Sequence, residues 1–145
     1  MSQPLFVDTG GWIAYFDKSD KDHAVFRDCF SRVVSGTAWR FHTSDYIIDE
    51  TVTFLRYHAS HATACSALDN FRDLGAAGLL VTLNINGAIS ARAEEIFRQY
   101  KDQTFSFTDC TSFALCQAYN IRHAATVDSD FRIFGLLVVP EDVTL

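Results

Sequence analysis

The sequence predicts an α/β fold, with helices covering both faces of a central, mainly parallel sheet in a three-layer α/β/α domain. Three observations predict it. Short apolar runs rich in Val, Leu and Phe alternate with longer stretches of helical periodicity. Strands separated by helices imply right-handed crossovers, which make neighbouring strands parallel. A length of 145 residues with 48% hydrophobic content supports one core, so we expect a single domain over residues 1–145.

The expected elements alternate along the chain. Apolar runs bounded by turn residues predict strands at residues 5–7, 40–43, 79–83, 124–127 and 136–139. Apolar residues that recur every three or four positions predict helices at residues 12–16, 23–34, 45–58, 62–74, 86–101 and 106–119, and a short turn is expected at residues 131–134.

Turn and capping residues mark the boundaries. A Thr-Gly-Gly turn at residues 9–11 separates the first strand from the first helix, and the polar residues 17–22 form a loop after that helix. Ser44 is a typical N-cap residue before the third helix. Gly75 closes the fourth helix, and Pro140 stops the last strand.

Charge narrows the function classes. The formal net charge of -6 argues against a protein that binds nucleic acid by basic surface alone, because counterion release requires Lys and Arg facing the phosphates. An acidic pocket can still act on nucleic acid when divalent cations stand between its carboxylates and the phosphate.

The cysteines and the hydropathy predict the cellular location of the protein. Cys29, Cys65, Cys110 and Cys116 form no C-x-x-C pair and have no His partner at zinc spacing, so we expect buried, reduced thiols. No apolar run approaches the length of a membrane span, and no signal-like segment opens the sequence. We therefore expect a cytoplasmic protein with no membrane partner.

Acidic residues stand in three places where the pattern favours other residues. Asp8 ends the first strand and Asp128 ends the fourth, and ligands of open α/β sheets bind beyond the carboxyl ends of strands. Asp109 lies in the first turn of a helix, where free backbone N–H groups favour negative charge. Each has a structural explanation when taken alone, as a turn former or helix-terminal residue, and Asp130 fits as the cap of a short helix.

Glu50 is anomalous for a different reason. It falls with Ile47 and Phe54 on one face of its helix, at spacings of three and four, whereas Asp49 lies on a polar face and is interpreted as a solvated acid. A charge along an apolar stripe is costly unless it is paired or bound to a metal ion. We expect Glu50 to face the three aspartates from its helix.

A cluster of carboxylates without matching Lys or Arg repels itself, and a divalent cation resolves the repulsion. Ligands that are all oxygens favour Mg²⁺ or Mn²⁺ over zinc. Our hypothesis is that Asp8, Asp109 and Asp128 hold the main ion, and that Asp8 and Glu50 approach a second ion that arrives with substrate.

Four segments stand in order along nearly the whole chain: VDTGGWIAYFDKSDKDH, SDYIIDETVTFLRYH, FSFTDCTSFALCQAYNI and HAATVDSDFRIFG. In this order and at these intervals they resemble the PIN-domain family, and within it the VapC-type toxins of prokaryotic toxin–antitoxin pairs. The resemblance implies a Rossmann-like domain that acts as a metal-dependent endoribonuclease with Mg²⁺ or Mn²⁺. It also implies an RNA substrate, a homodimer, and a cognate antitoxin that lays a peptide across the acidic groove.

The resemblance also assigns residues. Asp8, Glu50, Asp109 and Asp128 match the acidic, metal-binding and catalytic quartet, and Asp130 is a candidate fifth acid. Thr9 matches the small hydroxyl residue that follows the first Asp and orients a carboxylate or a water. The Gly-Gly pair at residues 10–11 departs from the apolar residue usual there, which predicts a looser loop beside the metal.

The aromatic residues divide into core and surface. Helical stripes predict that Phe26, Phe30, Phe54, Phe97 and Phe113 lie in the core. Interface candidates are Trp12, Tyr15, Phe16 and Tyr57. We expect the loops at residues 17–22 and 101–105 to contribute to RNA specificity, since functional variation concentrates in loops.

Other functions fit the sequence less well. A response-regulator receiver requires an acidic pair after its first strand and a Lys after its last, and neither is present. A haloacid-dehalogenase-type phosphatase requires D-x-D, and Gly10 fills the place of the second Asp. Two alternatives remain open: a PIN nuclease outside toxin–antitoxin systems, acting in RNA processing or on DNA structures, and a PIN-like binding module without activity.

Overall fold

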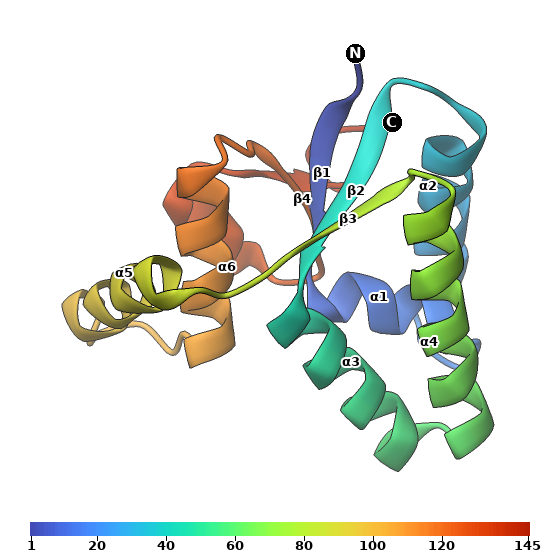
Figure 1. Ribbon diagram of the computed structural model, residues 1–145, viewed down its shortest axis with the longest axis horizontal. Coiled ribbons are helices and arrows are strands. Elements are labelled where there is room, and N and C mark those ends of the chain that lie inside the picture. Colours follow the sequence, from blue (N-terminus) through green and yellow to red (C-terminus); the bar gives the residue numbers. More distant parts are fainter.

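A computed structural model describes residues 1–145, which form a five-stranded parallel sheet flanked by helices (Figure 1). The strand order is β3-β2-β1-β4-β5, and every neighbouring pair is parallel. The strands are β1 (Gln3–Val7), β2 (Trp39–Ser44), β3 (Leu80–Leu83), β4 (His123–Ala125) and β5 (Leu137–Val139). The predicted fold class is confirmed.

The helices divide between the two faces of the sheet. They are α1 (Thr9–Phe16), α2 (His23–Ser35), α3 (Asp45–His58), α4 (His61–Ala76), α5 (Gly87–Gln99), α6 (Phe107–Ala118) and the 3-10 helix η1 (Ser129–Phe134). In Figure 1, α1 to α4 lie on one side of the sheet and the pair α5 and α6 on the other. The carboxyl end of β1 lies between these two groups of helices.

Two predicted boundaries near the carboxyl end of β1 are wrong. The helix α1 begins at Thr9, so the Gly-Gly pair belongs to its first turn and not to a loop. A Cβ on Gly11 would lie 2.7 Å from the backbone oxygen of Ala125, and a Cβ on Gly10 would lie 2.6 Å from a methyl group of Val127. The glycines therefore let α1 approach the chain after β4 closely, and the predicted looseness of this segment is wrong.

The second wrong boundary is the end of β4, which stops at Ala125 and not at Val127. The hydroxyl of Thr126 accepts a hydrogen bond from the backbone N–H of Asp128 at 2.9 Å. This side-chain bond forms a turn in place of strand pairing. Asp128 consequently lies three residues beyond the end of β4.

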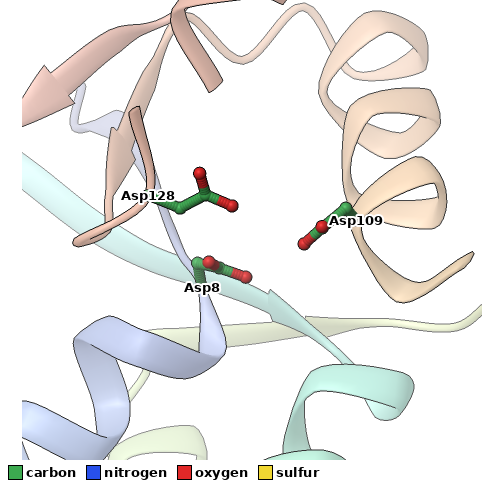
Figure 2. A group of neighbouring side chains, drawn as sticks. All are labelled: Asp8, Asp109 and Asp128. Carbon is green, nitrogen blue, oxygen red and sulfur yellow. The ribbon is translucent and has the colours of Figure 1, made fainter. Parts of the chain in front are cut away.

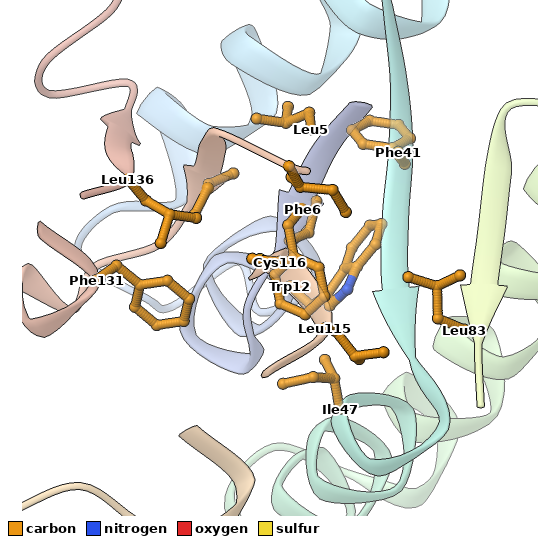
Figure 3. Packing of buried hydrophobic residues seen from close by; sticks show 14 of the residues in the cluster. Leu5, Phe6, Trp12, Phe41, Ile47, Leu83, Leu115, Cys116, Phe131 and Leu136 are labelled. Atoms are coloured by element: carbon orange, nitrogen blue, oxygen red, sulfur yellow. The ribbon is translucent and has the colours of Figure 1, made fainter. Parts of the chain in front are cut away.

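Aromatic side chains fill the core on both faces of the sheet. Trp12 is fully buried and lies near Phe41 in the core (Figure 3). Its ring also packs against Phe16, Phe30 and Phe71. On the other face, Phe113 packs against Phe105, Phe131 and Phe134. The predicted surface role of Trp12 is therefore wrong.

Three further predictions concern the burial of Phe97, the cysteines and membrane-spanning helices. Phe97, predicted to lie in the core, leaves 49% of its surface exposed. Cys29, Cys110 and Cys116 are buried as predicted, whereas Cys65 is exposed, and no cysteine forms a disulfide. None of the helices combines the length and the apolar character needed to cross a bilayer.

Candidate metal centre

The fold brings three of the predicted acids together. Carboxylate oxygens of Asp8, Asp109 and Asp128 all lie within 4.8 Å of one another. Asp8 follows β1, Asp109 lies in the first turn of α6, and Asp128 follows β4. Figure 2 shows the three side chains converging from these separate elements. We call this group the carboxylate cluster.

Asp8 is the buried member of the carboxylate cluster, with only 6% of its surface exposed. It occupies the N-cap position of α1 but makes no side-chain capping bond, so its carboxylate is turned to other partners. One oxygen accepts a hydrogen bond from the hydroxyl of Thr126 at 3.0 Å. Burial, reinforced by the negative charge of Asp109, raises the pKa of Asp8 to about 7.

Thr126 links two members of the cluster, a role that was not predicted from the sequence. Its hydroxyl donates to Asp8 and accepts from the backbone N–H of Asp128 at 2.9 Å. The residue is 3% exposed, so both bonds are shielded from water. The available signal was the T-x-D spacing, because a Thr two residues before an Asp commonly forms this type of turn.

Asp109 is held by a reciprocal helix cap. Its carboxylate accepts a hydrogen bond from the backbone N–H of Ser106 at 3.0 Å, and its own N–H donates to the hydroxyl of Ser106 at 3.0 Å. Burial raises the pKa of Asp109 despite the bonds from Ser106, and the charges of Asp128 and Glu50 raise it further. Asp109 is therefore both a capping residue and a member of the cluster.

Asp128 caps the 3-10 helix η1. One of its carboxylate oxygens accepts from the backbone N–H of Asp130 at 2.9 Å, so Asp128 is the cap and the interpretation of Asp130 as the cap is wrong. Asp130 is half-buried and lies outside the carboxylate cluster. Burial first, then the charge of Asp128, raises its pKa.

Glu50 reaches this region by a different route from the one predicted. The buried face of α3 carries Ile47, Thr51 and Leu55, whereas Glu50 is exposed, so the apolar-stripe interpretation is wrong. Its carboxylate accepts a hydrogen bond from the hydroxyl of Thr9 at 2.6 Å. Thr9 therefore orients a carboxylate, that of Glu50, at the rim of the cluster.

The donor set fits a hard divalent cation. The cluster offers carboxylate oxygens alone, and the ion pairs of the structure join other residues. Burial first, and then the charge of Asp109, raises the pKa of Asp8 in the absence of a Lys or Arg partner, and a cation would offset both effects. Oxygen-only ligation is what Mg²⁺ and Mn²⁺ prefer.

Comparison with known sequences yields a family and several relatives. The family model described as PIN domain matches residues 5–135. The chain is 27% identical to the 23S rRNA-specific endonuclease VapC20 of Mycobacterium tuberculosis, covering 93% of this chain and 97% of that protein. It is also 27% identical to the ribonuclease VapC26 of the same species, covering 86% of each. A VapC ribonuclease of Archaeoglobus fulgidus is 24% identical, covering 88% of this chain and 78% of that protein.

Solved structures share the fold. The crystal structure of Mycobacterium tuberculosis VapC20, described as a sarcin–ricin loop cleaving toxin, superposes with a TM-score of 0.80 at 24% identity over 92% of this chain and 96% of that one. The VapBC2 complex of Rickettsia felis bound to promoter DNA gives a TM-score of 0.66 at 14% identity, over 94% of this chain and 97% of that one. With the family model matching most of its length, the chain belongs to the PIN-domain family.

Proposed function

We propose that this protein is a metal-dependent endoribonuclease that hydrolyses RNA phosphodiester bonds. One observation carries the proposal: three carboxylates from separate elements lie within 4.8 Å of one another without a basic partner. Membership of the PIN-domain family supports it, as do relatives named as ribonucleases. In this proposal Asp8, Glu50, Asp109 and Asp128 are the catalytic and metal-binding acids.

A bound Mg²⁺ or Mn²⁺ would supply charge neutralisation at the phosphate and a more acidic water. The residues of the chain hold the carboxylates that would bind it. Thr126 fixes the orientation of Asp8, and Ser106 fixes that of Asp109. Because Thr126 is buried and Ser106 forms a reciprocal cap with Asp109, the donor oxygens are preorganised, which reduces the reorganisation that binding requires.

Glu50 and Asp130 flank this centre. The bond from Thr9 turns the Glu50 carboxylate toward the start of α1, where it is open to solvent and to substrate. We assign Glu50 to a second cation that arrives with RNA, and Asp130 as a supporting fifth acid. Neither belongs to the group of three, so the loss of either should affect substrate-dependent steps more than binding of the first cation.

The biological setting is a toxin–antitoxin pair of the VapBC type. The named relatives are VapC proteins, and one structural neighbour is a VapBC complex. We accordingly propose a cognate antitoxin, a homodimer and a cytoplasmic location. A small antitoxin-like reading frame directly upstream would support this setting, whereas its absence would favour a PIN nuclease of RNA processing.

The direct test is cleavage of a mixed tRNA and rRNA pool by purified protein free of antitoxin. We expect discrete fragments with Mg²⁺ or Mn²⁺, and none with a chelator or with Asp109→Asn. Asp49→Asn is the matched control, because Asp49 is an exposed acid of α3 outside the cluster. Absence of cleavage by folded wild-type protein with either cation would contradict the proposal and favour a binding module.

A further inference from the structure

A pocket of about 480 Å³ lies between the end of α5 and the segment that leads to α6. Its lining includes Phe97, Arg98, Lys101 and Gln103. We propose that this pocket binds an unstacked nucleotide of the RNA substrate, outside the carboxylate cluster. This inference rests on the proposed ribonuclease activity and adds a specificity subsite to it.

Phe97 of the pocket and its neighbour Phe107, which lies outside the lining, present aromatic surface to solvent. Phe97 is 49% exposed and Phe107 is 37% exposed, although each belongs to a helix whose other face is buried. Their ring centroids lie 6.1 Å apart with an interplanar angle of 64°, an edge-to-face contact that fixes both rings. Exposed rings of this kind stack with the bases of single-stranded RNA, which proteins recognise where bases are splayed out.

The polar lining suits a nucleotide. Lys101 is exposed and forms no ion pair, so its ammonium group is free to contact a phosphate. Arg98 pairs with Glu94 at 2.9 Å, which leaves the pocket with one net positive charge on a chain whose net charge is -6. The Gln103 amide offers both a donor and an acceptor for a base edge.

The segment that lines the pocket leads along the chain into the turn of α6 that holds Asp109. Phe107 stands two residues before Asp109, in the helical turn that Ser106 caps. Figure 1 shows α5 and α6 side by side, with their connection leading directly to the first turn of α6. An RNA strand bound at the cluster would extend along this connection to reach the pocket.

A nucleotide is a better occupant than a protein surface. Four of the seven lining residues are charged or carry an amide: Glu94, Arg98, Lys101 and Gln103. The core of a protein interface is instead depleted of charged residues, Lys and Glu among them. Charge complementarity and aromatic surface together favour RNA over a second copy of the chain.

The test measures RNA affinity in the Asp109→Asn background, where the strand stays intact. The probe is a fluorescein-labelled RNA that the wild-type protein cleaves, taken from the tRNA and rRNA pool. We expect Phe97→Ala to raise Kd about tenfold, since stacking on one aromatic ring contributes at that order. Phe97→Trp should restore the affinity, and Tyr119→Ala, which removes an equally exposed ring at the far end of α6, should leave it unchanged.

A second measurement tests the proposed contact between the Lys101 ammonium group and a phosphate. We expect Lys101→Gln to lower the slope of log Kd against log salt by about 0.7, the value for one phosphate contact on a single strand. An unchanged affinity in Phe97→Ala, or a loss that Phe97→Trp fails to restore, would overturn the subsite while wild-type cleavage still supported the nuclease. A changed sedimentation coefficient with unchanged RNA affinity would assign the surface to self-association. If wild-type protein cleaved no RNA of the pool, the proposed function itself would fail.

Discussion

For a single residue, Asp8, the structure indicates what a bound cation would relieve. Its carboxylate is buried and faces Asp109 and Asp128, so in metal-free protein its pKa rises from 3.8 to about 7. A group whose pKa is higher in the folded state contributes stability at pH below 3.8. That contribution is lost as the pH rises through about 7. Metal-free protein should therefore lose stability from this residue between about pH 4 and pH 7.

Asp8→Asn removes this titration. We compare the free energies of unfolding of the variant and the wild type in the presence of chelator. The difference should favour the variant more at pH 8 than at pH 5, because at pH 8 only the wild-type protein carries a buried negative charge at this position. Urea unfolding of both proteins at both pH values measures the difference. An equal difference at pH 5 and pH 8 would contradict the burial argument.

Thr126 allows a second test at the residue scale. Thr126→Val keeps the shape of the side chain but removes the bonds to Asp8 and to the N–H of Asp128. Partners that orient metal ligands typically contribute 10- to 100-fold to affinity or activity, so we expect a loss of about that size in Mn²⁺ affinity and in the RNA cleavage rate. Thr126→Ser retains the hydroxyl and should stay close to wild type. Equal behaviour of the Val and Ser variants would leave Thr126 with a packing role only.

Among the helices and strands, boundaries that depend on neighbouring residues were predicted correctly, and boundaries that depend on distant residues were not. Ser44 caps α3 at the predicted residue, because N-capping depends on neighbours in the sequence. The start of α1 was missed because Gly-Gly looks like a turn, whereas its reason is the close approach of Ala125, distant in sequence. The exposure of Glu50 was not predicted, because the buried residues of α3 follow Ile47 at steps of four, which leaves Glu50 on another face of the helix.

Gly11→Ala tests the close approach of α1. The new Cβ would lie 2.7 Å from the backbone oxygen of Ala125, so one of the two segments must shift. We expect a loss of about 1–3 kcal/mol in the free energy of unfolding, and slower RNA cleavage because Asp8 moves with α1. Gly75→Ala in α4 is the matched control, since its Cβ would meet nothing within 4 Å and Ala favours helix. Equal stability of the two variants would contradict the contact.

At the scale of the whole molecule, the acids after β1 and β4 could be placed at one sheet edge from the sequence. Parallel strands carry their carboxyl ends to the same side, and that rule needs only the order of strands and helices. The exposure of Phe97 and the links made by Thr126 could not be predicted, because they depend on how α5 and β4 meet distant segments. Periodicity specifies which residues alternate, but packing decides which of them remain uncovered.

Binding of a cation should stabilise the whole fold, because the cluster joins β1, α6 and the segment after β4. At a Mg²⁺ or Mn²⁺ concentration one hundred times Kd, linkage predicts about 2.7 kcal/mol of added stability. Thermal unfolding with and without the cation measures the gain. We expect Asp128→Asn to lose most of it and Asp49→Asn to keep it, whereas an equal gain in both would place the cation elsewhere.

Anomalous diffraction from crystals of the protein grown with Mn²⁺ would locate the bound cation directly. We predict one strong anomalous peak among the carboxylates of Asp8, Asp109 and Asp128, and none there in crystals of Asp109→Asn. Peaks confined to other parts of the surface, with this cluster empty at saturating Mn²⁺, would contradict the assignment of these residues as the metal centre.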